Sequence, residues 1–378
     1  MKTRSAEIAG GGIAGLAIGW GLARYGWRVR IHERASEIRE IGAGILLMNN
    51  SLSIFDHYGI ADLILHRAVP ISATERREYD GRLIERRALP GADRWTAVPR
   101  ADLVNGLAEA ARREGAEIIT NSTAVSADPS GTLTLESGEV ARADLVIAAD
   151  GFRSRLRDQL GLTLFAKERG SGATRLLLPR TKAEAEPIAR EYWSGKMRVG
   201  ITPCTPDITY VYMSCPNDDL RGAAVPIDAA YWQDAFPGIP DFFHRMPQVL
   251  AVTRHPYAHA VSRAWSNGQA ALIGDAAHSF PPTLGQGAGM AIFNGYALVR
   301  MLEKGNDISE TLKEWETRFR WVADRTQRWS LAIDALTTHW PRPLSVMRRS
   351  ILWAIGRSKK LNSRVRVADR IRLVGAHF

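Results

Sequence analysis

Residues 10–15 have the sequence Gly-Gly-Gly-Ile-Ala-Gly, and they lie between two segments with the composition of β-strands. Residues 6–9 form a short apolar run, and residues 28–32 alternate between polar and apolar side chains, which is typical of a strand. Residues 13–25 between them favour a helix. The order of strand, glycine turn, helix and strand within about 30 residues is the setting that a dinucleotide-binding GxGxxG fingerprint requires.

Each glycine of this fingerprint has a physical role. Gly10 permits the tight turn, Gly12 lets the backbone approach a pyrophosphate, and Gly15 lets the helix pack closely on the first strand. The helix amides that begin near Ile13 then face the phosphates. Glu33 ends the second strand, where a carboxylate can accept hydrogen bonds from both hydroxyls of an unphosphorylated ribose. Such a motif alone also occurs in ordinary tight turns, but the flanking strands and Glu33 favour a dinucleotide.

Two further glycine-marked segments follow buried apolar strands much later in the chain. Residues 143–149 end at Asp150-Gly151, and residues 270–273 end at Gly274-Asp275. In open α/β sheets, ligands collect at the carboxyl ends of strands, which is where both carboxylates stand. Asp150 could instead cap the helix that is expected to follow it. With residues 10–15, the order of the three segments predicts one FAD stretched across a fold whose pieces are interleaved along the chain.

A glycine-rich loop follows the third segment. It runs from Pro282 to Gly289, with glycines at positions 285, 287 and 289, and it exposes backbone amides where a helix is expected to start. Such a loop can bind the anionic edge of a flavin ring or a reactive oxygen adduct. His278 lies just before the loop. We expect this side chain to be structural, because no second His or Cys stands at ligand spacing for a metal.

The composition limits the class of protein. The 378 residues are 45% hydrophobic and 24% charged, as in a globular enzyme of one large or two interleaved domains. Met1–Ser5 leads straight into the first strand with no signal peptide, and no apolar run approaches the roughly 20 residues of a membrane span. The two cysteines, Cys204 and Cys215, fall in one predicted sheet region and suggest neither a metal cluster nor a disulfide framework. These features predict a reduced, cytoplasmic protein.

The net charge of +10 is concentrated near the C-terminus. Residues 342–378 hold ten Arg or Lys residues and one acid, Asp369, interspersed with apolar side chains such as Trp353. This segment could contact a membrane surface or nucleic acid, or it could be an amphipathic helix that covers the body of the protein. We favour the covering helix, because no nucleic-acid-binding motif accompanies the charge.

The succession of elements predicts an α/β fold, in which a Rossmann-like FAD-binding domain is interleaved with a β-sheet substrate domain and followed by C-terminal helices. Turns at Asp80-Gly81 and Pro90-Gly91, and strands near residues 198–202 and 208–214, belong to the substrate domain. The expected boundaries are residues 1–70, 98–165 and 262–330 for the FAD-binding domain, residues 71–97 and 166–261 for the substrate domain, and residues 331–378 for the C-terminal helical segment.

The three motifs, in this order, resemble those of the class A flavoprotein monooxygenases, which have the para-hydroxybenzoate hydroxylase fold. They are GxGxxG with its acid, Asp-Gly, and GDAAH…PxxGQGxG from Gly274 to Gly289, and the resemblance covers nearly the whole chain. It implies that NADH or NADPH reduces FAD and that O₂ adds at flavin C4a, giving a hydroperoxide that hydroxylates an electron-rich ring. It also implies that the residues that bind FAD are Gly10, Gly12, Ile13, Ala14, Gly15, Glu33, Arg34, Gly44, Arg100, Val125, Asp150, Gly151, Gly274, Asp275, Gly285, Gly287, Ala288 and Gly289.

Within that family, the sequence also resembles the oxygenases of hydroxypyridine carboxylates, such as 2-methyl-3-hydroxypyridine-5-carboxylate and pyridoxate. This resemblance places Arg175, Arg198 and Tyr210 beside the substrate, and Pro282 in the loop that holds the flavin. One departure is Thr74, which stands where another tyrosine is expected. The matching segments are residues 117–157, 175–180 and 220–228.

The chemistry of these side chains fits an anionic aromatic ligand. Arg198 and Tyr210 lie on two predicted neighbouring strands, so both could face one pocket. An arginine binds a carboxylate bidentately, and a tyrosine hydroxyl can bond a ring oxygen or nitrogen. Without the resemblance, the two residues could equally be a surface arginine and a core tyrosine. We expect Arg198 and Arg175 to anchor the carboxylate and Tyr210 to orient the ring.

The expected activity is therefore FAD-dependent hydroxylation of a hydroxylated aromatic or N-heteroaromatic acid, with ring opening after hydroxylation as a further option. A hydroxybenzoate- or salicylate-type hydroxylase is the alternative. A flavin reductase that inserts no oxygen, and a non-enzymatic prenyl-protein escort of the same fold, are less favoured. A small aromatic acid is the expected partner, nucleic acid is not, and a homodimer is one option for assembly.

Overall fold

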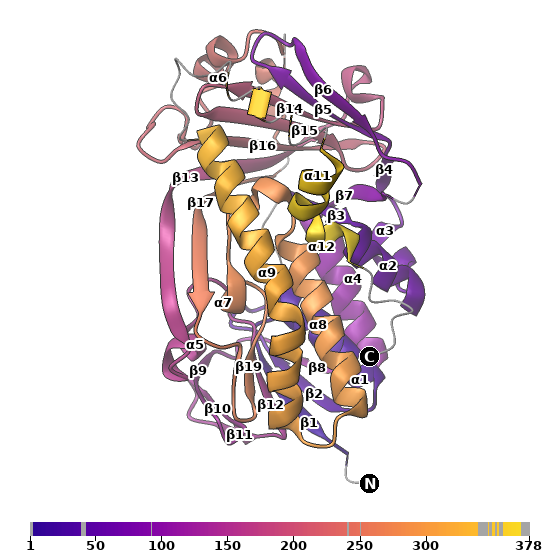
Figure 1. Cartoon of the computed structure of the whole chain (residues 1–378), viewed down its shortest axis with the longest axis vertical. Coiled ribbons are helices and arrows are strands. Elements are labelled where there is room, and N and C mark those ends of the chain that lie inside the picture. Colours follow the sequence, from indigo (N-terminus) through magenta and orange to yellow (C-terminus); the bar gives the residue numbers. More distant parts are fainter. Residues whose placement is uncertain are drawn as a thin grey trace.

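The computed structural model describes residues 3–38, 43–91, 93–239, 242–249, 251–338, 347, 350–351, 354 and 358–371. Most of the basic segment that was expected to cover the body, Trp353 included, lies outside this set. Two large sheets stand one above the other in Figure 1, and the long helix α9 (Ile308–Thr338) runs along both.

The lower sheet has six strands in the order β18-β19-β12-β1-β2-β8. Its members from β19 to β8 are parallel, and β18 pairs antiparallel to β19. β1 and β12 are buried along their whole length, and β12 is entirely apolar, as expected for parallel strands that are covered on both faces. The strands are β1 (Ser5–Ala9), β2 (Arg28–His32), β8 (Glu117–Ile119), β12 (Leu145–Ala148), β18 (Ser266–Asn267) and β19 (Ala270–Leu272).

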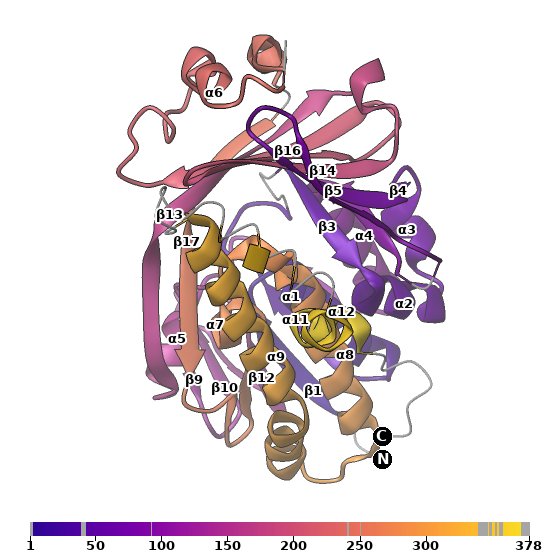
Figure 2. The same ribbon diagram turned by 45° about the horizontal axis from the view of Figure 1, so that its top comes forward.

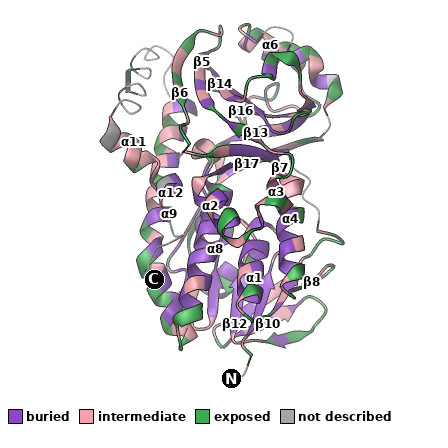
Figure 3. Cartoon of the chain, turned by 90° about the vertical axis from the view of Figure 1, so that its right-hand side faces the viewer, coloured by how far each residue is buried: buried purple, intermediate pink, exposed green. Residues whose placement is uncertain are grey.

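Helices cover one face of this sheet, and a small antiparallel sheet packs into the same core. The helix α1 packs between α4 and α8, and Figure 3 shows the buried faces of α1 and α8 against the strands. The helices are α1 (Ile13–Arg24), α4 (Arg100–Arg113) and α8 (Gly287–Lys304), and the small sheet consists of β9 (Ala124–Asp128), β10 (Thr132–Leu135) and β11 (Val140–Arg142).

The upper sheet has seven strands in the order β17-β13-β16-β15-β14-β5-β6. All neighbours are antiparallel except β14 and β5. Figure 2 shows α6 (Ala229–Ala235) on its outer side and β3 (Gly44–Met48), α1 and α8 below its inner side. The strands are β5 (Ala73–Glu78), β6 (Leu83–Ala88), β13 (Thr163–Pro179), β14 (Ile188–Ser194), β15 (Met197–Pro203), β16 (Ile208–Pro216) and β17 (Ala251–Ser262).

Shorter elements connect the two sheets. A three-stranded sheet in the order β3-β7-β4 carries the chain between them, and β13 and β17 form a long ribbon down one side. The remaining elements are β3 (Gly44–Met48), α2 (Asn49–Tyr58), α3 (Ala61–Leu65), β4 (Val69–Ile71), β7 (Trp95–Pro99), α5 (Arg155–Gln159), η1 (Lys182–Glu184), α6 (Ala229–Ala235), η2 (Phe243–Gln248), α7 (Asp275–His278), η3 (Pro282–Leu284), α11 (Lys359–Val365) and α12 (Val367–Arg370).

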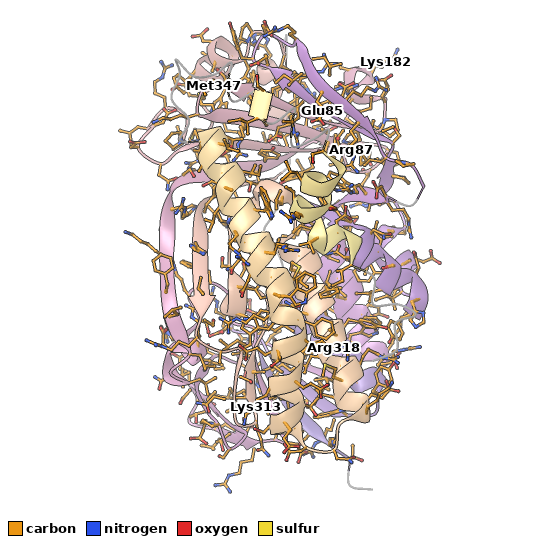
Figure 4. All side chains as sticks on the ribbon, in the orientation of Figure 1. Glu85, Arg87, Lys182, Lys313, Arg318 and Met347 are labelled. Atoms are coloured by element: carbon orange, nitrogen blue, oxygen red, sulfur yellow. The ribbon has the colours of Figure 1, made fainter. Side chains whose placement is uncertain are left out.

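The C-terminal helix α12 is tied to the body by a chain of ion pairs. Arg366 bonds Asp93 at 3.0 Å and also pairs with Asp369, whose carboxylate accepts the amide of Asn49 at 3.3 Å. Arg87 of β6, labelled in Figure 4, reaches the same Asp93 at 2.6 Å. The described end of the chain therefore packs on the protein, next to the N-terminus of α2.

The order of the strands confirms the predicted α/β class and its interleaving. The six-stranded sheet takes strands from residues 5–32, 117–148 and 266–272, whereas the seven-stranded sheet takes them from residues 73–88 and 163–262. The domain boundaries drawn from the sequence stay predictions.

Candidate functional site

The three glycine-marked segments lie side by side. β1 pairs with β12, and β12 pairs with β19, all in parallel, so their carboxyl ends meet at one edge of the sheet. The turns that follow them begin at Gly10, Ala149 and Ile273. Glu33 follows β2 on the other side of β1. The sequence separates these groups widely, and the parallel register brings them to the edge where ligands bind in open α/β sheets.

The turn after β1 is too tight for side chains. Gly10 has a φ of +107°, and a Cβ there would lie 2.4 Å from the carbonyl oxygen of Ala149. A Cβ at Gly15 would lie only 1.9 Å from the carbonyl oxygen of Gly10. Both distances are far below a van der Waals contact, so glycine is required at both positions for the helix to begin close to the strand.

Glu33 is held in place by the same turn. One carboxylate oxygen accepts the amide of Gly11 at 2.8 Å, and the other accepts the amide of Ala35 at 2.9 Å. Each carboxylate oxygen has a second lone pair. The side chain can therefore still accept from the ribose of an adenosine while it keeps the turn ordered.

Asp150 supplies a buried oxygen that no described group satisfies. Its Oδ2 accepts the amide of Leu156 at 3.3 Å, while its Oδ1 is buried without a hydrogen-bond partner. Burial raises the pKa of Asp150, against the lowering effect of hydrogen bonds from Ser154 and neighbouring amides. The helix-cap role that the sequence left open is thus partly present, although Ser154 is the N-cap residue of α5. The free oxygen fits a ligand hydroxyl, since buried polar atoms are normally satisfied.

Two long helices begin at this edge without a side-chain cap. Gly12, which has no side chain, precedes α1, and Gln286 precedes α8 without bonding the first amides of that helix. Such uncapped amides form an anion-binding site. Gln286 instead accepts a hydrogen bond from Asn50 at 3.0 Å, and a Cβ at Gly289 would lie 2.9 Å from that same amide group. The loop before α8 is therefore fixed against α2.

The other residues expected to bind FAD lie in turns, in short strands or at the starts of helices. Gly44 opens β3, and Arg100 opens α4 with its amide bonded to Ala43 at 2.9 Å. Asp275 begins α7 and is exposed. Arg34 is exposed beyond Glu33, Val125 lies in β9, Ile13 and Ala14 begin α1, Gly151 and Gly274 lie in the turns, and Gly285, Gly287 and Ala288 lie at the start of α8, with the exposed Pro282 just before them in η3.

These groups fit FAD. The uncapped amides suit a pyrophosphate, Glu33 suits a ribose, and the unsatisfied Asp150 oxygen suits a hydroxyl. The described residues contain no group of three or more His, Cys, Asp or Glu that could hold a metal ion. Among them there is also no helix long and apolar enough to cross a membrane.

His278, beside this edge, is a packed core residue. It is buried, and the amide nitrogen of Asn294 donates to its Nε2 at 2.7 Å. Its ring also lies against Trp265. Burial lowers the pKa of His278 to about 4, so the ring is neutral at physiological pH, as a structural role requires.

The inner face of the seven-stranded sheet carries a row of polar side chains. The outer face packs an apolar cluster with α6 and η2. Residues directly opposite on paired strands share a face, so Arg175 of β13 lies on the inner face with its partner Tyr212 of β16. Gly200 of β15 is the next partner in this row, and Glu191 of β14 follows it. The tyrosine lies over Gly200, where a Cβ would be 2.0 Å from its ring, and its hydroxyl donates to Glu191.

Tyr210 lies in the neighbouring row, opposite Thr202 of β15. Its ring packs on Gly44, where a Cβ would be 2.4 Å from Cγ of the tyrosine. Because Gly44 opens β3 beside the flavin edge, this contact joins the polar face to the expected cofactor site. Burial raises the pKa of Tyr210, while Arg175 works in the opposite direction through its charge and a hydrogen bond. The structure thus brings Arg175 and Tyr210 together.

Arg198 lies in a different row. It is opposite Ser214, four residues from Tyr210 along β16, which is about 13 Å of strand. The expected neighbouring strands are confirmed, but the two side chains occupy separate parts of the face. At the Arg198 end of the polar face, the hydroxyl of Tyr257 of β17 donates a hydrogen bond to Ser214 at 2.9 Å.

Arg198 is flanked by two carboxylates. Its guanidinium lies 3.9 Å from Glu191 and 3.8 Å from Asp334 of α9. Burial by itself lowers the pKa of Arg198. The charges of Tyr257, Glu191 and other neighbours raise this pKa by more than burial lowers it, so the net shift is upward. Four residues of this polar face were not predicted from the sequence: Glu191, Tyr212, Tyr257 and Asp334. Tyr212 could have been found from its two-residue spacing to Tyr210, whereas no local pattern marks Asp334.

Comparison with known proteins places this arrangement among flavoproteins. The sequence pattern of the FAD binding domain family matches residues 2–330. A probable 2-heptyl-3-hydroxy-4(1H)-quinolone synthase of Rhodococcus erythropolis is 35% identical over 336 residues, which are 87% of this chain and 88% of the relative. The 2-heptyl-3-hydroxy-4(1H)-quinolone synthase of Mycobacteroides abscessus is 34% identical over 365 residues, covering 95% of this chain and 96% of its own. The solved tetrameric form of 2-methyl-3-hydroxypyridine-5-carboxylic acid oxygenase is 33% identical, with a TM-score of 0.85 and coverage of 98% and 97%.

Proposed function

The chain belongs to the FAD binding domain family and is an FAD-dependent monooxygenase, and from this premise we propose that it hydroxylates an N-heteroaromatic ring bearing a hydroxyl or oxo group. The relatives described above are named for a hydroxyquinolone and for a hydroxypyridine carboxylic acid, and each of these compounds contains such a ring. The observation that carries the proposal is the pair of Arg175 and Tyr210 on the sheet face that meets the cofactor edge at Gly44.

We assign to the FAD-binding groups the roles that the sequence suggested. FAD, when bound, supplies the oxygen chemistry, with NADH or NADPH as reductant and O₂ as oxygen source. The amides that begin α1 bind the pyrophosphate, and Glu33 binds the adenosine ribose. Asp150 binds a ribityl or cofactor hydroxyl through its unsatisfied oxygen. The uncapped start of α8 binds the polar edge of the flavin ring.

Arg175 and Tyr210 prepare the ring for attack. Both side chains are only partly buried, so they can contact a ligand that lies between the sheet and the flavin. The Tyr210 hydroxyl donates to the ring oxygen, and the guanidinium of Arg175 stabilises negative charge on that oxygen. Charge on the oxygen makes the ring electron-rich, which is what an electrophilic oxygen donor requires. A ring bound between these side chains and the flavin would exclude water from the site.

A ring that also carries a carboxylate, as in a hydroxybenzoate-type hydroxylase, is the second candidate. Arg198 favours it, because a buried guanidinium on the same face can bind a carboxylate. Hydroxylation followed by ring opening is a variant of either proposal, and the product mass distinguishes the two outcomes. We further propose a cytoplasmic homo-oligomer. Light scattering after size exclusion separates a dimer from the tetramer named for the related oxygenase.

Product analysis under ¹⁸O₂ tests the function. The FAD-loaded protein is incubated with NADH or NADPH and one ring at a time: a 4-quinolone, a hydroxypyridine, or the corresponding carboxylates. The expected result is ring-stimulated oxidation of the nicotinamide and one ¹⁸O atom in the organic product. Nicotinamide oxidation that yields only hydrogen peroxide or water with every ring would refute the monooxygenase assignment of these substrates.

A further inference from the structure

Asp334 is a fully buried carboxylate that reaches the polar sheet face from another part of the fold. It lies near the C-terminal end of α9 and has no accessible surface. One oxygen, Oδ1, accepts the hydroxyl of Thr338 at 3.1 Å and lies 3.8 Å from Arg198. The other, Oδ2, lies 3.8 Å from Arg169 and has no hydrogen-bond partner. The residue therefore faces the arginine that the sequence suggested as a carboxylate anchor.

The charges at this end of the face already balance. Three ion pairs connect two cations and two anions in a chain: Arg169 with Asp334, Asp334 with Arg198, and Arg198 with Glu191. A buried charge is costly unless it is paired. Both carboxylates lie beyond hydrogen-bond distance of Arg198, whose Nε is buried without a hydrogen-bond partner, so they balance the charge of the guanidinium without satisfying its hydrogen bonds. A further carboxylate from a ligand would still add an unbalanced negative charge beside two existing ones.

Accessibility separates Arg198 from Arg175. The side chain of Arg198 is 3% exposed, and Tyr257 and Asp334 close around it. Arg175 keeps part of its surface accessible. Its recorded neighbour is Tyr210, and no carboxylate among the described residues forms an ion pair with it. Arg175 is thus an accessible cation next to a phenol, whereas the charge of Arg198 is balanced within the protein. Arg76, which lies on the same face beside Glu191, is paired with Glu85.

We infer that Asp334 determines specificity: it occupies the anion position at Arg198, so that the site accepts a ring with no carboxylate at that end. Such a ring is a neutral oxo- or hydroxy-N-heteroaromatic compound, held through its ring oxygen at Arg175 and Tyr210. The inference rests on the proposed function, because it names the substrate class of the same site. It selects the first candidate substrate over the carboxylated alternative.

Two probes that differ by one carboxylate test the inference. They are 2-methyl-3-hydroxypyridine and 2-methyl-3-hydroxypyridine-5-carboxylic acid, and their affinities for the FAD-loaded protein are measured by calorimetry at pH 7. The wild-type protein is expected to bind the neutral ring at least about tenfold more tightly, because like charges at close range in a buried site repel strongly. Equal affinity, or preference for the acid, overturns the inference without any variant.

The variant Asp334→Asn keeps the shape of the side chain and removes its charge. It is expected to shift the affinity ratio toward the acid by about tenfold or more, because Arg198 then lacks one counter-ion. The matched control is Asp324→Asn, which makes the same change on the same helix at a partly exposed aspartate paired with Arg320. It should leave the ratio unchanged. An unchanged ratio in a folded Asp334→Asn protein that still binds FAD contradicts the inference.

The binding ratio is independent of turnover, so the two proposals fail in different ways. If no ring gains an oxygen atom from ¹⁸O₂ but the ratio favours the neutral probe, the proposed function fails and the charge argument at Asp334 stands. If a ring that carries a carboxylate is hydroxylated efficiently and is bound more tightly than the neutral ring, the monooxygenase function stands and Asp334 has no role in substrate selection.

Discussion

The close approach of Gly15 to Gly10 gives a sharp prediction for the variant Gly15→Ala. The added Cβ would lie 1.9 Å from the carbonyl oxygen of Gly10, whereas an ordinary contact begins at 3.4 Å. The helix start and the turn must therefore separate by about 1.5 Å, the difference between these two distances. Because the atom in the way belongs to the backbone, no change of rotamer relieves the clash.

The expected loss of FAD affinity follows from that displacement. Overpacking of this kind costs about 1–3 kcal/mol in the protein alone. A shift of more than an ångström also breaks hydrogen bonds from the α1 amides to the pyrophosphate, and each bond to a charged group contributes about 1.5–3 kcal/mol. The loss of one such bond weakens FAD binding by about 10- to 100-fold, since about 1.4 kcal/mol corresponds to a factor of ten.

Fluorescence titration of the apoprotein with FAD measures the effect. Circular dichroism and thermal unfolding of the apoprotein show whether Gly15→Ala is folded. The control is Gly91→Ala, the same change at an exposed turn where a Cβ meets nothing within 4 Å. A folded Gly15→Ala protein whose FAD dissociation constant is within about threefold of the wild type would refute the placement of the pyrophosphate at this turn.

Three further predictions concern the core and the substrate face. In the variant Gly200→Ala, the Cβ would lie 2.0 Å from the aromatic ring of Tyr212. The affinity for the substrate ring should weaken about tenfold while the affinity for FAD stays unchanged. Equal losses of substrate affinity and FAD affinity in calorimetry would contradict this prediction and point to general misfolding. In Arg175→Gln, affinity for the ring should fall by about tenfold or more while FAD stays bound, and unaltered ring affinity would remove Arg175 from the site. Burial lowers the pKa of His278 from 6.5 to about 4, so the unfolded chain binds this proton more readily, and the stability that the neutral ring contributes above pH 6.5 is lost as the pH falls toward 4. Urea unfolding should show this residue's contribution to be about 2 kcal/mol smaller at pH 5 than at pH 7, and an identical pH dependence in His278→Gln would contradict it.

The cofactor edge was predictable because its signals are local. A positive φ at Gly10 and the contact between Gly15 and Gly10 both arise within a few residues of sequence. The strands on either side are short apolar or alternating runs whose period identifies them. Glu33 ends such a strand, and its bonds to Gly11 and Ala35 are equally local. Once three segments of this kind occur in order, a parallel sheet brings their ends together, and this is enough to locate the cofactor edge.

The substrate face was predictable only in part, because its contacts are long-range. The sequence placed Arg198 and Tyr210 on neighbouring strands, and the register shows that they lie in rows well apart along β16. Sequence periodicity identifies a strand but does not fix which residue of the next strand lies opposite. The pair of Arg198 and Asp334 joins β15 to a helix that lies far along the chain. No propensity or motif indicates such a pair, so the neutralisation of Arg198 was not visible.

The two halves of the site are specified by different parts of the chain, and this explains how related proteins can share a cofactor and differ in substrate. On the proposed assignment, FAD is bound mainly by backbone amides and glycines, whose geometry tolerates changes in most neighbouring side chains. On the same assignment the ring contacts side chains such as Arg175 and Tyr210, and Asp334 acts on it only through Arg198. A single substitution in that set can therefore change the charge that the site accepts without moving the cofactor. Relatives named for a quinolone and for a pyridine carboxylic acid match this chain at 34% and 33% identity, so overall identity does not separate them. If Asp334 selects the substrate as we propose, the charge of the side chain beside Arg198 should discriminate between such relatives better than the fraction of identical residues does.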